Sequence, residues 1–355
     1  MKRRLLEILV CPWCGGGFEV IPLGEPSPGG DVEEGALRCA CGRAFPIIRG
    51  IPRILDKVFD EFPEFARRHP EAAARPVSAA TVDETDEAIR RTSDSFGYQW
   101  TTFADMATDF RENFLQYIYP VDTSFFPGKL GLDMGCGFGR HIYNAAKFGA
   151  EMVGVDLSEA IESTRRNTLG MPNVHLVQAD VYHLPFRPAT FDFVYSIGVL
   201  HHLPDPEAGF RAIVRLVRQG GAAFIWVYSK SRSVVNALLE AARPITTRLP
   251  RRLQKLLSLG GATVDWVGFI VPYRVASRMP GLGGLVERMM FERIKVYSHY
   301  PFQVVYADWF DRLAAPIRFY YDEQDMRQWL QRAELSRTVV SPTGLYGWRA
   351  YGERL

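Results

Sequence analysis

The sequence has few cysteines, almost no net charge and no long apolar run, and each absence narrows what the chain can be. Five cysteines in 355 residues offer no disulfide framework of the kind found in small secreted proteins. No run approaches the ~18 apolar residues of a membrane span, and residues 1–7 (MKRRLLE) lack the apolar core of a signal peptide. We therefore expect a cytoplasmic globular protein, long enough for about one to three domains.

The net charge of +2 points to no particular partner, but it is unevenly distributed. Residues 229–300 contain twelve Lys or Arg and four Asp or Glu, so this segment carries +8 and the remainder of the chain −6. The basic excess is confined to one segment.

Four of the five cysteines, Cys11, Cys14, Cys39 and Cys41, lie close together in the sequence. Each pair can sit on a tight turn, and the roughly 25 intervening residues allow a hairpin to bring the pairs together. A segment this short cannot form a stable core without a bound metal, which favours a structural Zn²⁺ with all four positions filled. The alternative is four reduced cysteines that merely pack, and the single residue between Cys39 and Cys41 is fewer than the usual two.

Residues 5–12 (LLEILVCP) and 45–55 (FPIIRGIPRIL) extend this pattern. With the cysteines, they resemble the small zinc-ribbon proteins that activate tRNA and translation-factor methyltransferases and that also occur fused to the front of bacterial methyltransferases. The resemblance covers residues 1–55 and implies a docking or stabilising module, not a catalytic one. Residues 56–92 are typical of a charged linker with helical pieces.

The rest of the chain is organised around a glycine-rich stretch at residues 132–140 (LDMGCGFGR), between an expected strand and an expected helix. Glycines at alternate positions let the backbone turn tightly and approach a ligand where a side chain would collide. Arg140 occupies the place where a dinucleotide fingerprint needs its last glycine. A chance glycine turn is the alternative. The cofactor-binding candidates in this stretch are Asp133, Gly135, Cys136, Gly137 and Gly139.

Strands and helices alternate from residue 128, which predicts a parallel sheet covered on both faces. The expected strands are 129–133, 151–156, 174–178, 191–197 and 222–228, with helices that include 158–168 and 207–219. Asp156 ends the second strand, where a carboxylate can accept both hydroxyls of a ribose. Asp180 follows the third strand, where it can take a purine amine. Each acid alone could instead cap a helix. The remaining cofactor candidates are Leu157, Val181 and Ser196.

Residues 128–228 resemble the class I S-adenosylmethionine-dependent methyltransferases in the glycine motif, the two acids, residues 191–196 (FDFVYS), residues 199–205 (VLHHLPD) and the glycine turn at 219–221. The resemblance implies S-adenosylmethionine as cofactor and a Rossmann-like α/β fold, a parallel sheet with one antiparallel C-terminal strand. The implied core is 93–228 and 320–355, with a helical substrate-recognition insertion at 229–319 after the fifth strand. Near the C-terminus we expect a helix at 322–333 and strands at 336–341 and before residue 352.

Methyl transfer is an in-line displacement that mainly requires alignment and the exclusion of water. An alcohol acceptor also benefits from a base, and His201 and His202 follow the fourth strand, near where the family's methyl group points. We favour His201. The alternative is that one imidazole caps a helix and the other packs in the core. The substrate candidates are Tyr98, Tyr228, His299 and Tyr300.

The insertion mixes bases with leucines at 248–257 and adds apolar segments at 266–271 and 285–294. One interpretation is a lid for an anionic or amphipathic acceptor, with peripheral membrane contact through 229–300. The other is a helical cap with a solvated basic face. The leading hypothesis is therefore a methyltransferase for a small, lipid-linked or nucleotide-linked metabolite, with oxygen as the favoured acceptor atom. An RNA methyltransferase is the second hypothesis, although the ribbon is nearly neutral, and a noncatalytic cofactor- or partner-binding scaffold is the third.

Overall fold

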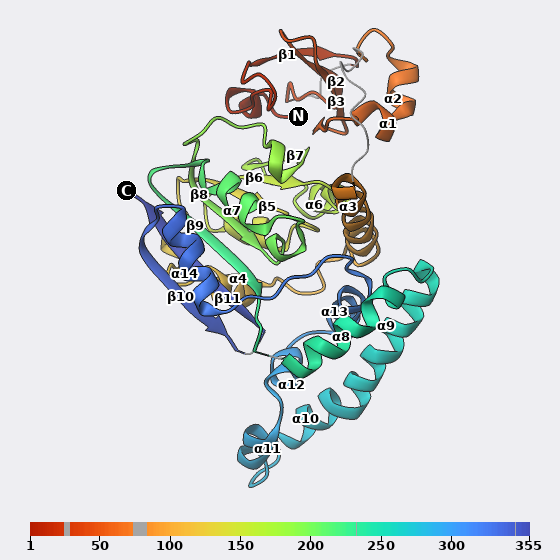
Figure 1. The fold of residues 1–355 in the computed structure, drawn as a ribbon, viewed down its shortest axis with the longest axis vertical. Helices are drawn as coiled ribbons and strands as arrows, with labels where there is room; N and C mark the ends of the chain where they lie inside the picture. The colour runs from red at the N-terminus through yellow and green to blue at the C-terminus, as the bar shows by residue number, and fades with distance from the viewer. Residues whose placement is uncertain (25–28, 74–83, 232, 345) are drawn as a thin grey trace.

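The computed structural model describes residues 1–24, 29–73, 84–231, 233–344 and 346–355. Its described strands form one sheet of eleven, in the order β1-β2-β3-β4-β7-β6-β5-β8-β9-β11-β10 (Figure 1). The strands are β1 (Phe18–Pro22), β2 (Glu34–Cys39), β3 (Ala44–Ile48), β4 (Ile51–Ile54), β5 (Leu130–Met134), β6 (Glu151–Asp156), β7 (Val174–Ala179), β8 (Phe191–Ile197), β9 (Val217–Tyr228), β10 (Ser336–Thr343) and β11 (Gly347–Arg354).

Helices connect and cover these strands. The α-helices are α1 (Val58–Glu61), α2 (Pro63–Arg68), α3 (Glu84–Thr102), α4 (Arg111–Tyr117), α5 (Arg140–Lys147), α6 (Ile161–Asn167), α7 (Pro206–Val214), α8 (Ser233–Thr246), α9 (Arg251–Asp265), α10 (Val271–Ala276), α11 (Gly283–Met289), α12 (Glu292–Tyr297), α13 (Phe302–Ala314) and α14 (Glu323–Arg332). Shorter 3-10 turns are η1 (Arg3–Glu7), η2 (Thr123–Phe125), η3 (Val181–His183) and η4 (Leu200–His202), and η5 (Trp266–Ile270) is π-helical.

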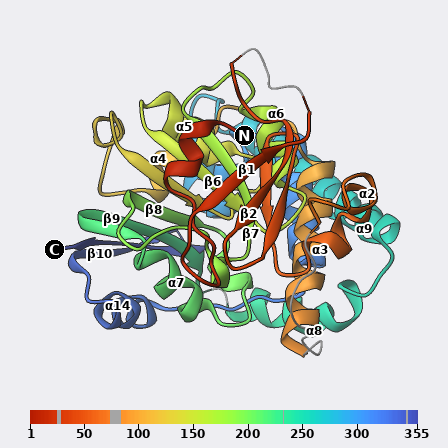
Figure 2. The ribbon, with the colours of Figure 1, turned by 90° about the horizontal axis from the view of Figure 1, so that it is seen from above.

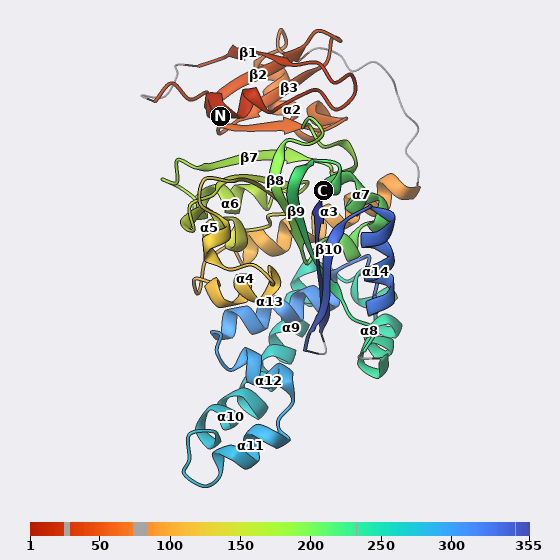
Figure 3. The same cartoon turned by 90° about the vertical axis from the view of Figure 1, so that its left-hand side faces the viewer.

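The central strands β7, β6, β5, β8 and β9 are parallel, and β11 returns antiparallel beside β9. Successive side chains enter different cores: Phe193 packs in one cluster and Val194 in the other. Figures 2 and 3 show α4 and α5 on one face of the sheet and α7 and α14 on the opposite face. The Rossmann-like α/β fold with one antiparallel C-terminal strand is confirmed.

The fifth strand differs from its prediction. It begins at Val217, five residues earlier than expected, and α7 correspondingly ends at Val214. The glycine turn at 219–221 lies inside the strand, where the register against β8 shifts between Phe191 and Phe193. A Cβ at Gly221 would lie 2.6 Å from the Asp192 carbonyl oxygen, so the close approach of the two strands requires glycine there.

The N-terminal ribbon is continuous with the main sheet, although residues 1–55 read as a self-contained unit. Strand β4 pairs in parallel with the edge strand β7. Arg53 is 1% exposed, donates to the Gln178 side chain at 2.9 Å and forms an ion pair with Glu162 of α6. Ribbon residues such as Phe45 share a core cluster with Val177. The structure describes the linker 56–92 as α1, α2 and the start of α3; its residues 74–83 lie outside the described ranges.

The insertion is helical, as expected, and α13 packs against α9, α8 and α3. Helices α9, η5 and α10 form one 26-residue helix, Arg251–Ala276, which is long and apolar enough to cross a bilayer by length and composition. The expectation that no segment approaches a membrane span is thus corrected. The helix contains no long run of consecutive apolar residues, because glycine, serine and threonine separate its leucines and valines.

Candidate active site

A cavity of about 500 Å³ lies at the carboxyl ends of the parallel strands, and it is also lined by α3 and by α12 and α13 of the insertion. Its volume falls in the ~300–1,000 Å³ range of small-molecule sites. The predicted residues that line it are Gly135, Cys136, Gly137, Asp156, Leu157, Asp180, Val181, His202, Tyr228 and Tyr300.

The glycine loop between β5 and α5 forms the floor of this cavity. Gly135 has φ +80°, and a Cβ there would lie 2.3 Å from Val199 Cγ2. The Gly135 and Cys136 N–H groups both donate to the Val155 carbonyl of β6, at 2.7 and 3.0 Å, which ties the loop to the neighbouring strand. The loop therefore holds its backbone open to a ligand where any larger residue would close it.

Asp156 reaches across to the same loop. Its Oδ2 accepts from the Gly137 N–H at 2.9 Å, while its Oδ1 accepts from the Ser158 N–H and hydroxyl at 2.9 and 2.7 Å. Burial raises the pKa of the Asp156 carboxyl. The Ser158 hydroxyl in turn accepts from the Ala160 N–H at 3.2 Å, and neither Asp156 nor Ser158 caps α6, whose N-cap residue is Ala160.

Asp180 lines the cavity and also caps a short helix, and capping was the alternative interpretation of this residue. Its Oδ1 accepts from the Tyr182 N–H at 3.1 Å, which caps η3. Its Oδ2 lies 3.6 Å from His183 Nδ1, and this contact raises the pKa of His183. Asp180 and the neighbouring Val181 both line the cavity.

Three predicted cofactor residues lie outside the lining: Asp133, Gly139 and Ser196. Asp133 is 2% exposed, and burial raises its pKa to about 8. The Ser196 hydroxyl donates to the Met134 carbonyl at 3.1 Å, and a Cβ on Gly139 would lie 3.1 Å from Thr164 of α6. Ser196 and Gly139 thus contact the protein around the glycine loop. That any of these three residues touches a ligand stays a prediction.

An aromatic wall faces the glycine loop. Trp100 of α3 would lie 3.5 Å from a Cβ on Gly137 and stacks on Phe138 with 5.0 Å between ring centroids. The Arg140 guanidinium lies 5.6 to 5.9 Å from the rings of Trp100, Phe110 and Phe138. Trp100 is therefore placed to cover a ligand on the loop.

The two candidate bases occupy different environments. His201 is fully buried and lies outside the lining, neither ring nitrogen has a hydrogen-bond partner among the described residues, and burial holds its pKa well below the usual value. His202 lines the cavity. Its Nδ1 lies 2.6 Å from the Ile317 carbonyl, which fixes the tautomer with Nδ1–H donating and Nε2 unprotonated. Burial lowers the pKa of His202 to about 4. Position thus favours His202, and the preference for His201 stays an untested prediction.

A buried polar cluster from the insertion meets His202. The Tyr228 hydroxyl donates to Asp311 Oδ2 at 2.7 Å, and Arg318 donates to the same oxygen at 3.0 Å. All three side chains line the cavity. Asp311 and Arg318 were not predicted as site residues, because they lie more than 80 residues from Tyr228 and carry no local motif. Hydroxyl, carboxylate and guanidinium together offer the donors and acceptors that orient a polar acceptor.

Two predicted substrate residues lie elsewhere. Tyr98 packs on Phe310 with 5.7 Å between centroids and under the Arg251 guanidinium at 5.4 Å, and His299 is exposed. Neither belongs to the lining. The aromatic segment around Tyr98 does approach the site, but the helical period of α3 turns Trp100 rather than Tyr98 toward it.

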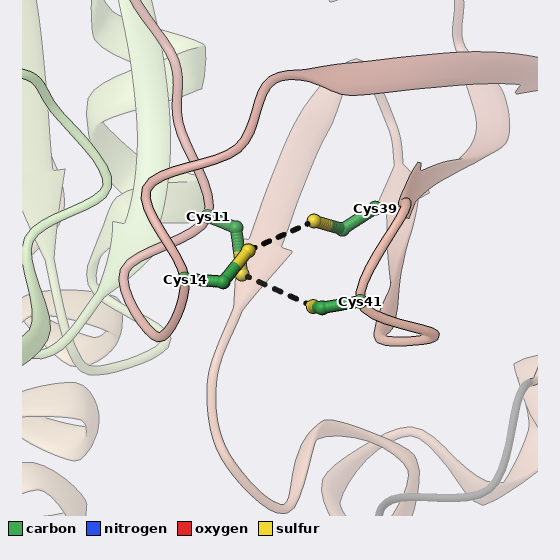
Figure 4. Close-up of side chains that lie close together, drawn as sticks. All are labelled: Cys11, Cys14, Cys39 and Cys41. Atoms are coloured by element: carbon green, nitrogen blue, oxygen red, sulfur yellow. Dashed lines mark hydrogen bonds between the residues drawn. The ribbon is translucent and has the colours of Figure 1, made fainter.

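The four ribbon cysteines converge (Figure 4). Their sulfur atoms all lie within 4.8 Å of one another, with Cys11 to Cys41 at 3.9 Å and Cys14 to Cys39 at 3.3 Å. Four thiolates around one zinc at ~2.3 Å would stand about 3.8 Å apart, so the geometry fits a tetrahedral ion. The four cysteines can thus hold one metal ion, and the short Cys39–Cys41 spacing does not prevent it.

This cysteine turn contacts the loop that follows Asp180. Trp13, between the first two cysteines, stacks on His183 with 5.8 Å between centroids and 12° between planes. The Val10 N–H donates to the Pro185 carbonyl at 2.9 Å. The ribbon therefore supports η3, whose residues Val181 and Tyr182 line the cavity.

Comparisons with known proteins agree with this arrangement. A family model described as a methyltransferase domain matches residues 132–225, and one described as a Trm112p-like protein matches residues 2–50. Among solved structures, a complex between the Haloferax volcanii Trm112 methyltransferase activator and a methyltransferase aligns with 74% of this chain and 97% of that one, at 13% identity and a TM-score of 0.44.

Curated relatives match about half of the chain or less. A ubiquinone biosynthesis O-methyltransferase of Azoarcus sp. (strain BH72) is 28% identical over 184 residues, which are 47% of this chain and 71% of the relative. One of Proteus mirabilis (strain HI4320) is 31% identical over 140 residues, which are 39% of this chain and 57% of the relative. The chain thus spans little more than half of the second relative. Residues 132–225 are thus similar to a methyltransferase domain, and residues 2–50 before them are similar to a Trm112p-like protein.

Proposed function

We propose that this chain transfers the methyl group of S-adenosylmethionine to an oxygen atom of a small-molecule acceptor. The observation that carries the proposal is one cavity that joins the glycine loop, Asp156 and Asp180 to His202 and the Tyr228–Asp311 pair. The names of the curated relatives, O-methyltransferases of ubiquinone biosynthesis, support oxygen as the acceptor atom.

When bound, S-adenosylmethionine supplies an electrophilic methyl group on a sulfonium sulfur. In our account Asp156 accepts the ribose hydroxyls, Asp180 accepts from the adenine amine, and Trp100 covers the methionine end over the loop. Residues of α3, α12 and α13 line the cavity together with the glycine loop, so they would hold the acceptor in line with the methyl group.

His202 is the proposed base. Its Nδ1–H bond to Ile317 holds the ring so that Nε2 can take the acceptor hydroxyl proton as the methyl group arrives. With a pKa of about 4, the imidazole is neutral throughout the physiological range. The base form is present above that pKa and is lost only as the pH falls through it. We therefore expect kcat to show no loss from His202 protonation between pH 6 and 8.

Replacement of His202 by asparagine tests this role. Asparagine keeps a donor near the Nδ1 position but removes Nε2, so kcat should fall by about 10²- to 10⁴-fold, with little change in cofactor affinity. The matched control is His201→Asn, one residue away, for which we expect a loss below about tenfold. The reverse pattern, a large loss for His201→Asn alone, would instead support the base favoured from the sequence.

The acceptor class can be identified directly. Purified protein with methyl-labelled S-adenosylmethionine and host-cell extract should place the label in a small-molecule fraction, aqueous or lipid. Label in the RNA fraction would support RNA methylation, and no labelled fraction at all would support a noncatalytic scaffold. Neither alternative is favoured by four of the curated relatives, which carry the name ubiquinone biosynthesis O-methyltransferase.

Three further parts of the proposal concern the setting of this reaction. We propose zinc as the ion at the cysteine site, because four thiolates with tetrahedral spacing suit that metal. We propose the cytoplasm as the location and a lipid-linked or nucleotide-linked molecule as an acceptor compatible with the mixed polar and aromatic lining. We also propose peripheral membrane contact through residues 229–300.

A further inference from the structure

The long helix of the insertion, Arg251–Ala276, buries polar as well as apolar side chains: Ala262, Ile270 and Tyr273 pack in a hydrophobic cluster on its inner side. Its buried side carries polar residues: Gln254, Ser258 and Asp265 are all at most 9% exposed. Asp265 accepts from the Trp309 indole N–H at 2.6 Å and pairs with Arg293 of α12, and Gln254 donates to the Thr246 carbonyl at 2.9 Å. The polar groups of this helix are thus satisfied by the protein, not by water.

The outward side of the same helix is apolar. Exposed residues recur at the three- and four-residue intervals of one helix face, and Val264, Val267 and Val275 are 62%, 64% and 60% exposed. We call this surface, together with the helix ends beyond it, the apolar arm face. It consists of Leu253, Leu256, Leu257, Val264, Val267, Val271, Val275, Met279, Leu282, Leu285, Met289 and Phe291. A continuous exposed surface of this kind marks an interaction site.

Positive charge accompanies the apolar arm face. The segment 229–300 carries +8. Arg252, Arg278 and Arg288 are exposed, and none of them has a carboxylate partner within the described ranges. Two copies of this face would bring two such charged segments together, which opposes self-association. Apolar contact combined with unpaired guanidinium groups matches lipid phosphate above an acyl layer.

We propose that the apolar arm face binds the surface of an anionic phospholipid bilayer. The helix lies in the plane of the interface and does not cross the membrane, because its inner face is bonded to α12 and α13 through Asp265, Arg293 and Trp309. Figure 3 shows α10 and α11 at the end of the molecule opposite the ribbon, so the arm can reach a surface without the ribbon intervening.

With the apolar arm face on the bilayer, the membrane surface lies beside the cavity. Phe291, just before α12, is 73% exposed, and Val296 of α12 is 41% exposed. Glu292 and Val296 of α12 also line the cavity. An acceptor dissolved in the bilayer would then meet the active site along α12. The docking itself does not depend on the proposed reaction, because vesicle binding is measured without any methyl acceptor.

The experiment is co-sedimentation of the full-length, metal-loaded protein with vesicles of phosphatidylcholine, alone or mixed with phosphatidylglycerol. We expect binding to the anionic vesicles that weakens as salt is raised. The double variant Leu256→Glu/Val267→Glu should lose at least about tenfold in vesicle affinity, because two apolar side chains become charged. The matched control is Leu169→Glu, the same change at a residue 79% exposed near the end of α6, which should bind like the wild type.

Two results would overturn the proposal. One is equal sedimentation with neutral and anionic vesicles, or with the wild type and the double variant. The other is a concentration-dependent dimer in analytical ultracentrifugation that the double variant abolishes while no vesicle binding is seen, since a second copy would then be the occupant. Cofactor affinity of the double variant, measured alongside, reports whether the methyltransferase core is intact.

Discussion

Asp156→Ala should reduce the affinity for S-adenosylmethionine by about 100-fold or more, because two hydrogen bonds to a charged group are each worth ~1.5–3 kcal/mol. The carboxylate also accepts from the Gly137 N–H, so its removal frees the glycine loop as well as the proposed ribose site. Isothermal titration of the purified variant measures the change.

A matched control separates loss of the site from loss of an ordinary buried contact. Asp192 accepts from the Leu130 N–H at 2.7 Å, at the opposite end of β5 from the glycine loop. Asp192→Ala therefore removes a carboxylate-to-backbone bond of similar length from the start of β5 but should leave cofactor affinity within about threefold. If Asp156→Ala bound the cofactor as tightly as the wild type, the role assigned to Asp156 would be wrong.

Removal of the metal should have the second large effect. We expect about one zinc per chain, and chelation should lower Tm by more than about 5 °C, since structural zinc contributes strongly to the folding of its domain. The loss should extend beyond the ribbon because β4 pairs with β7 and Phe45 packs in the main core. Cofactor affinity should fall too, because Trp13 and Val10 support the loop after Asp180.

Metal analysis of a natively purified sample and thermal unfolding with and without chelator test these expectations. Adding zinc back should restore both Tm and cofactor affinity, which distinguishes metal loss from irreversible damage. Native protein that contained no zinc, or a Tm unchanged by chelation, would contradict the assignment.

Much of the cofactor half of the site was predictable because its signals are local. Strands β5, β6 and β7 are short and mostly apolar, and the glycine loop or an acid lies at the end of each, so sequence order alone places Asp156 and Asp180 at one edge of the sheet. Sequence order cannot show which neighbours face the ligand. Ser196 lies in the correct strand, yet its hydroxyl points to the Met134 carbonyl.

The acceptor half was less predictable because it is assembled from distant segments. Asp311 and Arg318 meet Tyr228 only after the insertion has folded back onto the core. The pairing of β4 with β7 likewise joins residues more than 120 positions apart. In the arm, helical periodicity separates two faces, but the packing of α13 against α9 decides which of them is buried.

The central claim, methyl transfer to oxygen on a small molecule, is tested most directly by S-adenosylmethionine carrying a ¹³C-methyl group. After incubation with host-cell extract, the chemical shift of the transferred carbon reports the atom to which it is attached. Our account predicts a methoxy carbon in a small-molecule fraction, absent when Asp156→Ala replaces the wild type. A methyl carbon bound to nitrogen, or one found only in RNA or protein, would contradict it.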